Sequence, residues 1–124
     1  MKNLIYTSDV SIEDHSNFVV FKNSDGDIEA IHIERDDNTE TFLIYNVELF
    51  NKPSDSWINK DDLKSMNESC DTNYEFDTEL NDFDKYLFSS DLCWYFGANN
   101  LDNYSLQFNN YNSFIEWLKS RNLI

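Results

Sequence analysis

Carboxylates are the side chains with the widest chemical scope in this sequence. Twenty-four Asp and Glu residues stand against nine Lys and Arg residues, which gives the 124-residue chain a net charge of −15. Pairs of carboxylates act as general acids and bases in hydrolases, and groups of them support metal-assisted reactions. Any spacing between two acids occurs by chance in so acidic a chain, so spacing alone identifies no catalytic pair. A small hydrolase that uses a hidden carboxylate pair stays open as one alternative.

Other residue types that catalytic motifs require are scarce. The only glycines are Gly26 and Gly97. This excludes a Walker loop, a dinucleotide-binding fingerprint and a GxSxG nucleophile elbow, because each needs two or more glycines at close spacing. The two histidines, His15 and His32, belong to no HExxH motif and to no Cys/His ligand cluster. We therefore expect a protein that works by binding and is not an enzyme.

One segment, 23–27, is superficially similar to a calcium-binding loop. Placing Gly26 at the glycine position of such a loop puts Phe21 at the first ligand position and His32 at the position of the final bidentate acid. Neither residue supplies the carboxylate that calcium requires there. The segment is better explained as a hairpin turn, and the sequence predicts no metal site and no cofactor.

The acids are concentrated in two blocks. Residues 25–40 contain seven acids and Arg35, a net charge of −6, and residues 68–102 contain nine acids and Lys85, a net charge of −8. Solubility, or adaptation to a salty cytoplasm, is one explanation of this charge. Direct binding to a nucleic acid backbone is excluded, since phosphate contacts need Lys and Arg. We expect instead a positively charged protein partner.

Aromatic residues alternate with acids in the second block, between residues 73 and 91. Rings supply buried area at an interface, and carboxylates steer the encounter and pair with Arg. We expect Phe83 to belong to the core with Leu80 and Leu87, and other rings of this block to lie at the surface. The candidate partner-binding residues are Asp77, Glu79, Asp82, Asp84 and Tyr86 in the second block, and Asp36 and Asp37 in the first.

The location of the protein is predicted from the absence of sorting signals in the sequence. The apolar run near Leu4 is far too short for a signal peptide, and no stretch approaches the length of a transmembrane helix. Cys70 and Cys93 form no CxxC motif, and we expect both to be free, buried thiols. Nothing activates either thiol for catalysis with His32. The expected location is the cytoplasm, without a membrane partner.

The first half of the sequence predicts a meander of strands. Segments rich in β-branched and aromatic residues predict strands at 4–7, 17–22, 27–34 and 41–47. The dipeptide Asp25-Gly26 predicts a hairpin turn, because glycine accepts the positive φ of a primed turn. A polar turn is expected at 35–38.

The second half predicts helices and two further strands. Short helices are expected at 59–67 and 78–88, and strands at 92–96 and 104–108 around a polar turn at 98–103. Ser113 and Glu116 have capping-box spacing and predict the start of a C-terminal helix. Together these elements predict one α+β domain over residues 1–124, with an antiparallel sheet of about five strands and two or three helices packed on it.

The size, the charge and the C-terminal segment give the chain a resemblance to a known group of proteins. The segment 104–108 leads into Ser113-Phe114-Ile115-Glu116-Trp117-Leu118. In this respect the chain resembles the immunity proteins that protect bacteria from polymorphic or contact-dependent toxins. The resemblance implies that it binds and neutralises a basic toxin domain acting in the cytosol, a nuclease whose nucleic-acid site it occludes. The alternative is a phage-encoded anti-CRISPR or other DNA-mimic inhibitor, and a structural subunit of a larger assembly is a further one.

Overall fold

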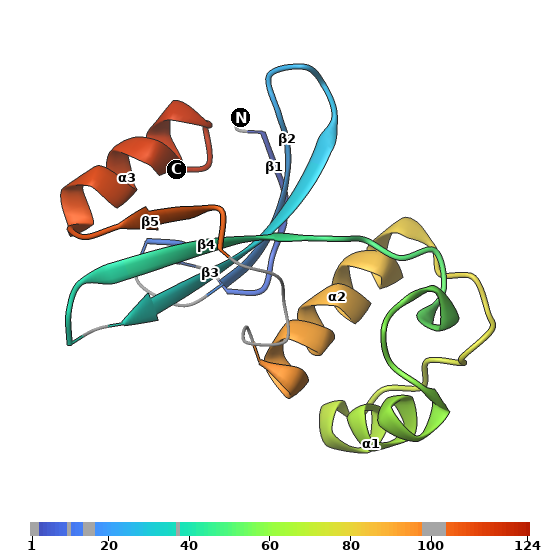
Figure 1. Ribbon diagram of the computed structural model, residues 1–124. Helices are drawn as coiled ribbons and strands as arrows, with labels where there is room; N and C mark the ends of the chain where they lie inside the picture. The colour runs from blue at the N-terminus through green and yellow to red at the C-terminus, as the bar shows by residue number, and fades with distance from the viewer. Residues whose placement is uncertain (1–2, 10, 14–16, 37, 98–103) are drawn as a thin grey trace. The chain divides into compact units, whose positions relative to one another are not determined.

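The computed structural model describes residues 3–9, 11–13, 17–36, 38–97 and 104–124 (Figure 1). The chain forms two compact units. Unit 1 comprises residues 1–47 and 101–124, and unit 2 comprises residues 48–100. Each unit has its own hydrophobic core. A single domain over residues 1–124 stays a prediction.

Unit 1 is built on a five-stranded antiparallel sheet. Its strands are β1 (Leu4–Thr7), β2 (Asn17–Lys22), β3 (Ile28–Asp36), β4 (Thr41–Val47) and β5 (Leu106–Phe108), and they lie side by side in sequence order. One helix, α3 (Tyr111–Ser120), follows β5 (Figure 1). The α+β fold class, the antiparallel sheet and the C-terminal helix are therefore confirmed.

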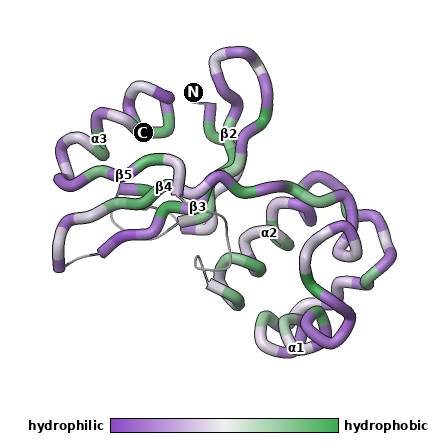
Figure 2. The backbone as a smooth tube through the Cα atoms, in the orientation of Figure 1, coloured by the Kyte–Doolittle hydropathy of each residue, from purple (hydrophilic) through white to green (hydrophobic). Residues whose placement is uncertain are grey.

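The connection between β2 and β3 confirms the hairpin expected at Asp25-Gly26. The Asn23 side-chain oxygen accepts hydrogen bonds from the backbone N–H groups of Asp25 and Asp27, both at 2.9 Å. Gly26 has a φ of +86°, a value that side chains with a Cβ rarely adopt. This connection is coloured mostly as hydrophilic in Figure 2.

One face of the sheet carries the core of unit 1. Alternation along the strands puts Ile31 and Ile33 on this face, where Val19 pairs with Ile31 and Ile33 pairs with Ile44. Helix α3 packs here through Phe114, whose ring stacks on Phe42 with centroids 4.3 Å apart. These contacts bury the apolar side of α3 and hold the C-terminal segment on the sheet.

Helix α3 begins earlier than the sequence predicts. Its N-cap is Asn110, whose side-chain oxygen accepts a hydrogen bond from the N–H of Ser113 at 2.8 Å. The prediction that Ser113 caps the helix is wrong. Ser113 is the third residue of the helix, since Tyr111 and Asn112 extend the helical turn before it.

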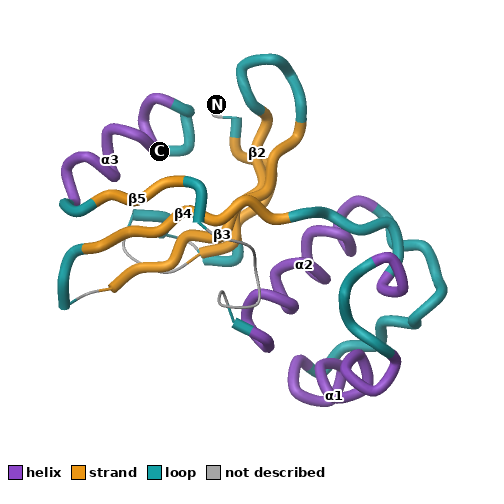
Figure 3. The backbone as a smooth tube through the Cα atoms, viewed as in Figure 1, coloured by secondary structure: helices purple, strands orange, loops and turns teal. Residues whose placement is uncertain are grey.

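Unit 2 consists of helices and loops in its described part (Figure 3). A 3₁₀ turn at Pro53–Asp55 precedes α1 (Lys60–Cys70) and α2 (Asp82–Phe96). Asn59 and Asp62 form a capping box at the start of α1. The core of the unit contains residues from both helices and the loop before α1, namely Ile58, Leu63, Met66, Phe88 and Leu92. The helix expected at 59–67 is confirmed, and it continues to Cys70.

The strand expected at 92–96 is wrong. These residues form the last turns of α2, which ends at Gly97. Five consecutive apolar residues give no period that separates a strand from a helix, and the helix is fixed by the burial of Leu92 and Phe88 on the same side. The helix expected at 78–88 starts at Asp82 instead of Thr78.

The last expected strand is shorter than predicted. Only Leu106–Phe108 are in the strand, although the N–H of Ser105 donates to the carbonyl oxygen of Ile44 at 2.7 Å. The polar turn expected at 98–103 lies outside the described residues.

Candidate functional site

The structure brings five of the seven candidate residues into one stretch of chain. Asp77 and Glu79 lie in the connection before α2, Asp82 and Asp84 in its first turn, and Tyr86 in its second. We call residues 77–86 the acidic segment. Asp36 is exposed at the end of β3 in unit 1, and Asp37 lies outside the described residues.

The acidic segment is anchored at its middle. The N–H of Leu80 donates to the carbonyl oxygen of Asn51 at 2.7 Å, and the Leu80 side chain packs against the core of unit 2. Asn81 caps α2, because its side-chain oxygen accepts a hydrogen bond from the N–H of Asp84 at 2.8 Å. The backbone that carries the acids is therefore held by two hydrogen bonds, one at Leu80 and one at the start of α2.

The carboxylates of this segment face water. Asp77, Glu79 and Asp82 are exposed, and Asp84 is half-buried. Lys85 lies 3.7 Å from Asp82, whose side chain is 85% exposed, so this ion pair contributes little stability. The cation neutralises one of the four acids, and the segment stays negative.

An aromatic ring lies at the surface within the acidic segment. Phe83 is 58% exposed, so its predicted place in the core with Leu80 and Leu87 is wrong. Leu80 packs against the core of unit 2, and Leu87 is half-buried. Helix α2 starts at Asp82, and its inner face is taken by Phe88 and Leu92, so Phe83 turns away from that core.

A second cluster of unit 2 joins Cys70, Tyr74 and Asp91. The Tyr74 hydroxyl donates a hydrogen bond to the Asp91 carboxylate at 2.9 Å. Burial raises the pKa of Asp91, an effect that the hydrogen bond from Tyr74 partly offsets. Burial and the nearby Asp91 carboxylate raise the pKa of both the Tyr74 hydroxyl and the Cys70 thiol. Both groups keep their protons at neutral pH, so the cluster supplies no ready nucleophile.

The other cysteine is equally unsuited to nucleophilic catalysis. Burial raises the pKa of the Cys93 thiol to about 12. Burial also lowers the pKa of His32, whose ring centroid is 6.3 Å from that of Tyr45 in β4. Both cysteines are free, as expected; Cys93 is buried, whereas Cys70 is only half-buried.

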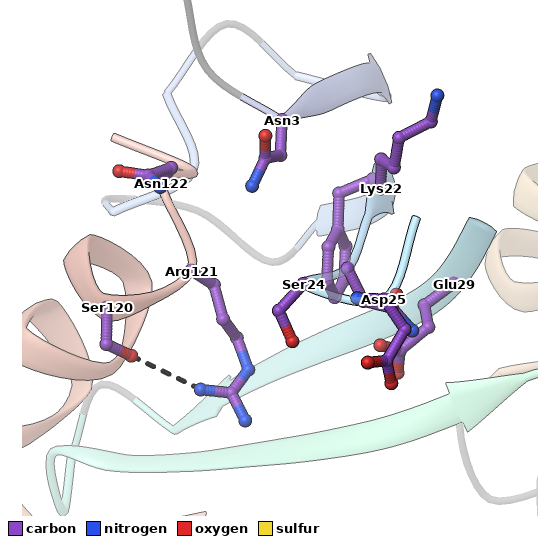
Figure 4. A pocket seen from close by; sticks show the side chains of 10 residues that line it. Asn3, Lys22, Ser24, Asp25, Glu29, Ser120, Arg121 and Asn122 are labelled. Carbon is purple, nitrogen blue, oxygen red and sulfur yellow. Dashed lines mark hydrogen bonds between the residues drawn. The ribbon is translucent and has the colours of Figure 1, made fainter. Parts of the chain in front are cut away.

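Unit 1 contains a polar cavity that sequence reasoning did not identify (Figure 4). Its volume is about 320 Å³, and it lies between the end of α3 and the start of the β2–β3 hairpin. The Arg121 side chain extends into it from the α3 end, opposite Asp25 and Glu29 (Figure 4). The Arg121 guanidinium lies 4.5 Å from the ring centroid of Trp117, which positions the cation. Lys22 also lines the cavity. The one feature of the sequence that bears on this cavity is that Lys22 and Arg121 are two of only nine Lys and Arg residues in an acidic chain.

Two negative findings apply to the described part of the chain. Among those residues, no group of three or more His, Cys, Asp and Glu side chains is placed to hold a metal ion. In the same residues, no helix combines the length and the apolar character needed to cross a membrane.

No protein-family model matches the chain, and no curated protein or solved structure is significantly similar to it.

Proposed function

We propose that this chain is a cytoplasmic protein inhibitor that binds a basic toxin domain and neutralises it. The target is a nuclease, and the chain occludes the surface that receives nucleic acid phosphates. The observation that carries the proposal is the exposed Phe83 ring among the exposed carboxylates of Glu79 and Asp82. A ring of this kind fills a pocket on a partner, and the carboxylates around it pair with Arg and Lys.

Helix stability explains only some of the acids in the segment. Asp82 and Asp84 in the first turn of α2 interact favourably with the helix dipole. Asp77 and Glu79 precede the helix, and among the described residues no ion pair involves either of them. Their exposed position fits an electrostatic role toward a partner.

The proposed mechanism has two stages. The net charge of −15 first accelerates the encounter with a basic surface, because long-range attraction raises the association rate. Close contacts of Phe83 and Tyr86, with the acids paired to Arg, then slow dissociation. Asp36 and Asp37 in unit 1 are proposed as further contacts.

The test is binding to the product of the gene immediately upstream of this one. We expect that protein to be basic, to be toxic when expressed alone, and to co-purify with this chain. The triple variant Asp77→Asn, Glu79→Gln, Asp82→Asn is expected to lower the association rate about tenfold at low salt, with a smaller effect at high salt.

A matched control removes the same charge elsewhere in unit 2. Asp55→Asn, Glu68→Gln, Asp71→Asn changes three exposed acids outside the acidic segment. Equal slowing by both triple variants would mean that only total charge matters. An upstream product that is neither basic nor toxic contradicts the proposal, and phage structural genes at that place would favour the DNA-mimic alternative.

A further inference from the structure

Helix α2 is apolar on two opposite faces. Its inner face buries Phe88, Ser89, Leu92 and Cys93. Residues 83, 87, 90 and 94 are spaced by four, three and four positions, so they follow one another along a single face of the helix. We call Phe83, Leu87, Ser90 and Trp94 the outer stripe. With 100° per residue, this stripe points away from the inner face.

The outer stripe ends in two strongly exposed rings. Phe83 is 58% exposed and Trp94 is 70% exposed, while Leu87 and Ser90 between them are half-buried. A helix whose outer side faces only water carries polar residues there. Exposed aromatic side chains aligned on one face are typical of a protein-binding surface.

The charges beside the stripe indicate what binds it. Asp84 lies on one flank of the stripe. Asp91, seven residues further on, shares that flank, but its carboxylate accepts the hydrogen bond of Tyr74 inside unit 2. The one cation of α2, Lys85, lies on the opposite side of the helix from Phe83. At its Phe83 end the stripe is therefore an apolar row beside the carboxylates of the acidic segment, which complements an apolar groove bordered by Arg and Lys.

We propose that α2 lays its outer stripe into an apolar groove of the basic partner, with Phe83 and Trp94 as the two anchors. This inference rests on the proposed function and specifies its geometry. The anchors are 11 residues apart, about 16 Å along the helix axis. Recognition is then of the helix-in-groove kind, in which side chains at helical spacing fill successive pockets.

The experiment measures binding kinetics of the purified chain to the purified product of the upstream gene. The variants are Phe83→Ala and Trp94→Ala. Each is expected to weaken binding roughly 30-fold, mainly through faster dissociation. The control is Trp57→Ala, because Trp57 is 48% exposed in the loop before α1 and packs on Phe96 with centroids 4.9 Å apart. A change below about threefold is expected there.

The outcomes separate this inference from the proposed function. No binding by the wild-type chain overturns both. Binding that is slowed by the acidic-segment triple variant but unchanged by Phe83→Ala and Trp94→Ala leaves the function in place and overturns the helix-in-groove geometry. Circular dichroism of each variant checks that α2 is still folded. Self-association of the chain that Trp94→Ala abolishes would identify a second copy as the occupant and would also overturn the proposal.

Discussion

The Tyr74 hydroxyl donates a hydrogen bond to the half-buried Asp91 carboxylate at 2.9 Å, and this contact links the α1–α2 connection to the middle of α2. The Asn67 side chain holds the same connection, because its amide donates to the Tyr74 carbonyl at 3.0 Å and its oxygen accepts from the Tyr74 N–H at 3.1 Å. The Tyr74 ring also meets Phe88 edge-on, with centroids 5.2 Å apart. The position of α2 within unit 2 therefore depends on Tyr74.

Removal of the Tyr74 hydroxyl should destabilise the protein. Tyr74→Phe keeps the ring contact with Phe88 but deprives Asp91 of its donor, which should cost about 1 kcal/mol in the free energy of unfolding. Urea denaturation at neutral pH measures the loss. Tyr95→Phe, at an exposed ring of the same helix, is the control and should change stability little. Equal stability of Tyr74→Phe and wild type would show that the hydrogen bond contributes nothing.

Asp91 should make stability depend on pH in a defined direction. Its pKa is raised above the ordinary value of 3.8, so the folded chain holds a proton there that the unfolded chain has already released. The contribution of this group is thus most favourable at low pH and is lost as the pH rises through the raised pKa. Asn resembles the protonated acid. The free energy of unfolding of Asp91→Asn, taken relative to wild type, should therefore be higher at about pH 7 than at about pH 3.

The measurement compares unfolding free energies of Asp91→Asn and wild type at both pH values. Because the two chains share all other acids, the difference between them isolates Asp91. Asp77→Asn removes one exposed carboxylate and controls for the change in net charge. A difference between Asp91→Asn and wild type that is the same at both pH values would contradict the effect of burial.

The two thiols should differ in reactivity. Cys93 is 4% exposed and its pKa is raised to about 12, so in Cys70→Ala the remaining thiol should react with a maleimide only when the protein opens. Labelling at about pH 8 should be more than tenfold slower than in urea. The half-buried Cys70, tested in Cys93→Ala, should react faster than Cys93. Rapid native labelling of Cys93 would show that the last turns of α2 open readily.

The meander of unit 1 could be predicted from local sequence, and the phase of α2 could not. Strands 4–7, 17–22 and 41–47 have the predicted bounds, because β-branched and aromatic residues there are delimited by polar turns. In α2, apolar residues occupy every side of the helix, so periodicity does not show which side is buried. This is why the sequence predicts a core position for Phe83 and a strand at 92–96.

The candidate site could be predicted by composition but not by geometry. The sequence locates the acids of the segment 77–86, yet their exposure depends on where α2 begins and which of its faces packs inward. Trp94 carries no signal of its 70% exposure, because a Trp in an apolar run is most simply a core residue. The polar cavity near Arg121 combines residues from both ends of the chain, which no local pattern connects.

The start of α3 gives a direct comparison between a cap predicted from sequence and the one in the structure. Asn110→Ala removes the side chain that accepts from the Ser113 N–H and should cost about 1 kcal/mol of stability. Ser113→Ala should change stability by less than about 0.5 kcal/mol, because Ser113 is exposed and already inside the helix. Thermal or urea unfolding of both variants shows whether Asn110 or Ser113 caps the helix. The opposite order of effects would restore Ser113 as the cap.

Substitutions in the two cores test whether the chain unfolds as one domain. Phe114 is buried in unit 1 and Phe88 in unit 2, and replacing either by Ala should cost about 3 to 5 kcal/mol in its own unit. If the chain is one cooperative domain, each variant lowers the midpoint of a single transition seen by all probes. If the units unfold independently, Phe88→Ala lowers only the helical signal of unit 2 and leaves the transition of the sheet unchanged. Residue-specific hydrogen exchange resolves the two units, and two separate transitions would contradict the one-domain prediction.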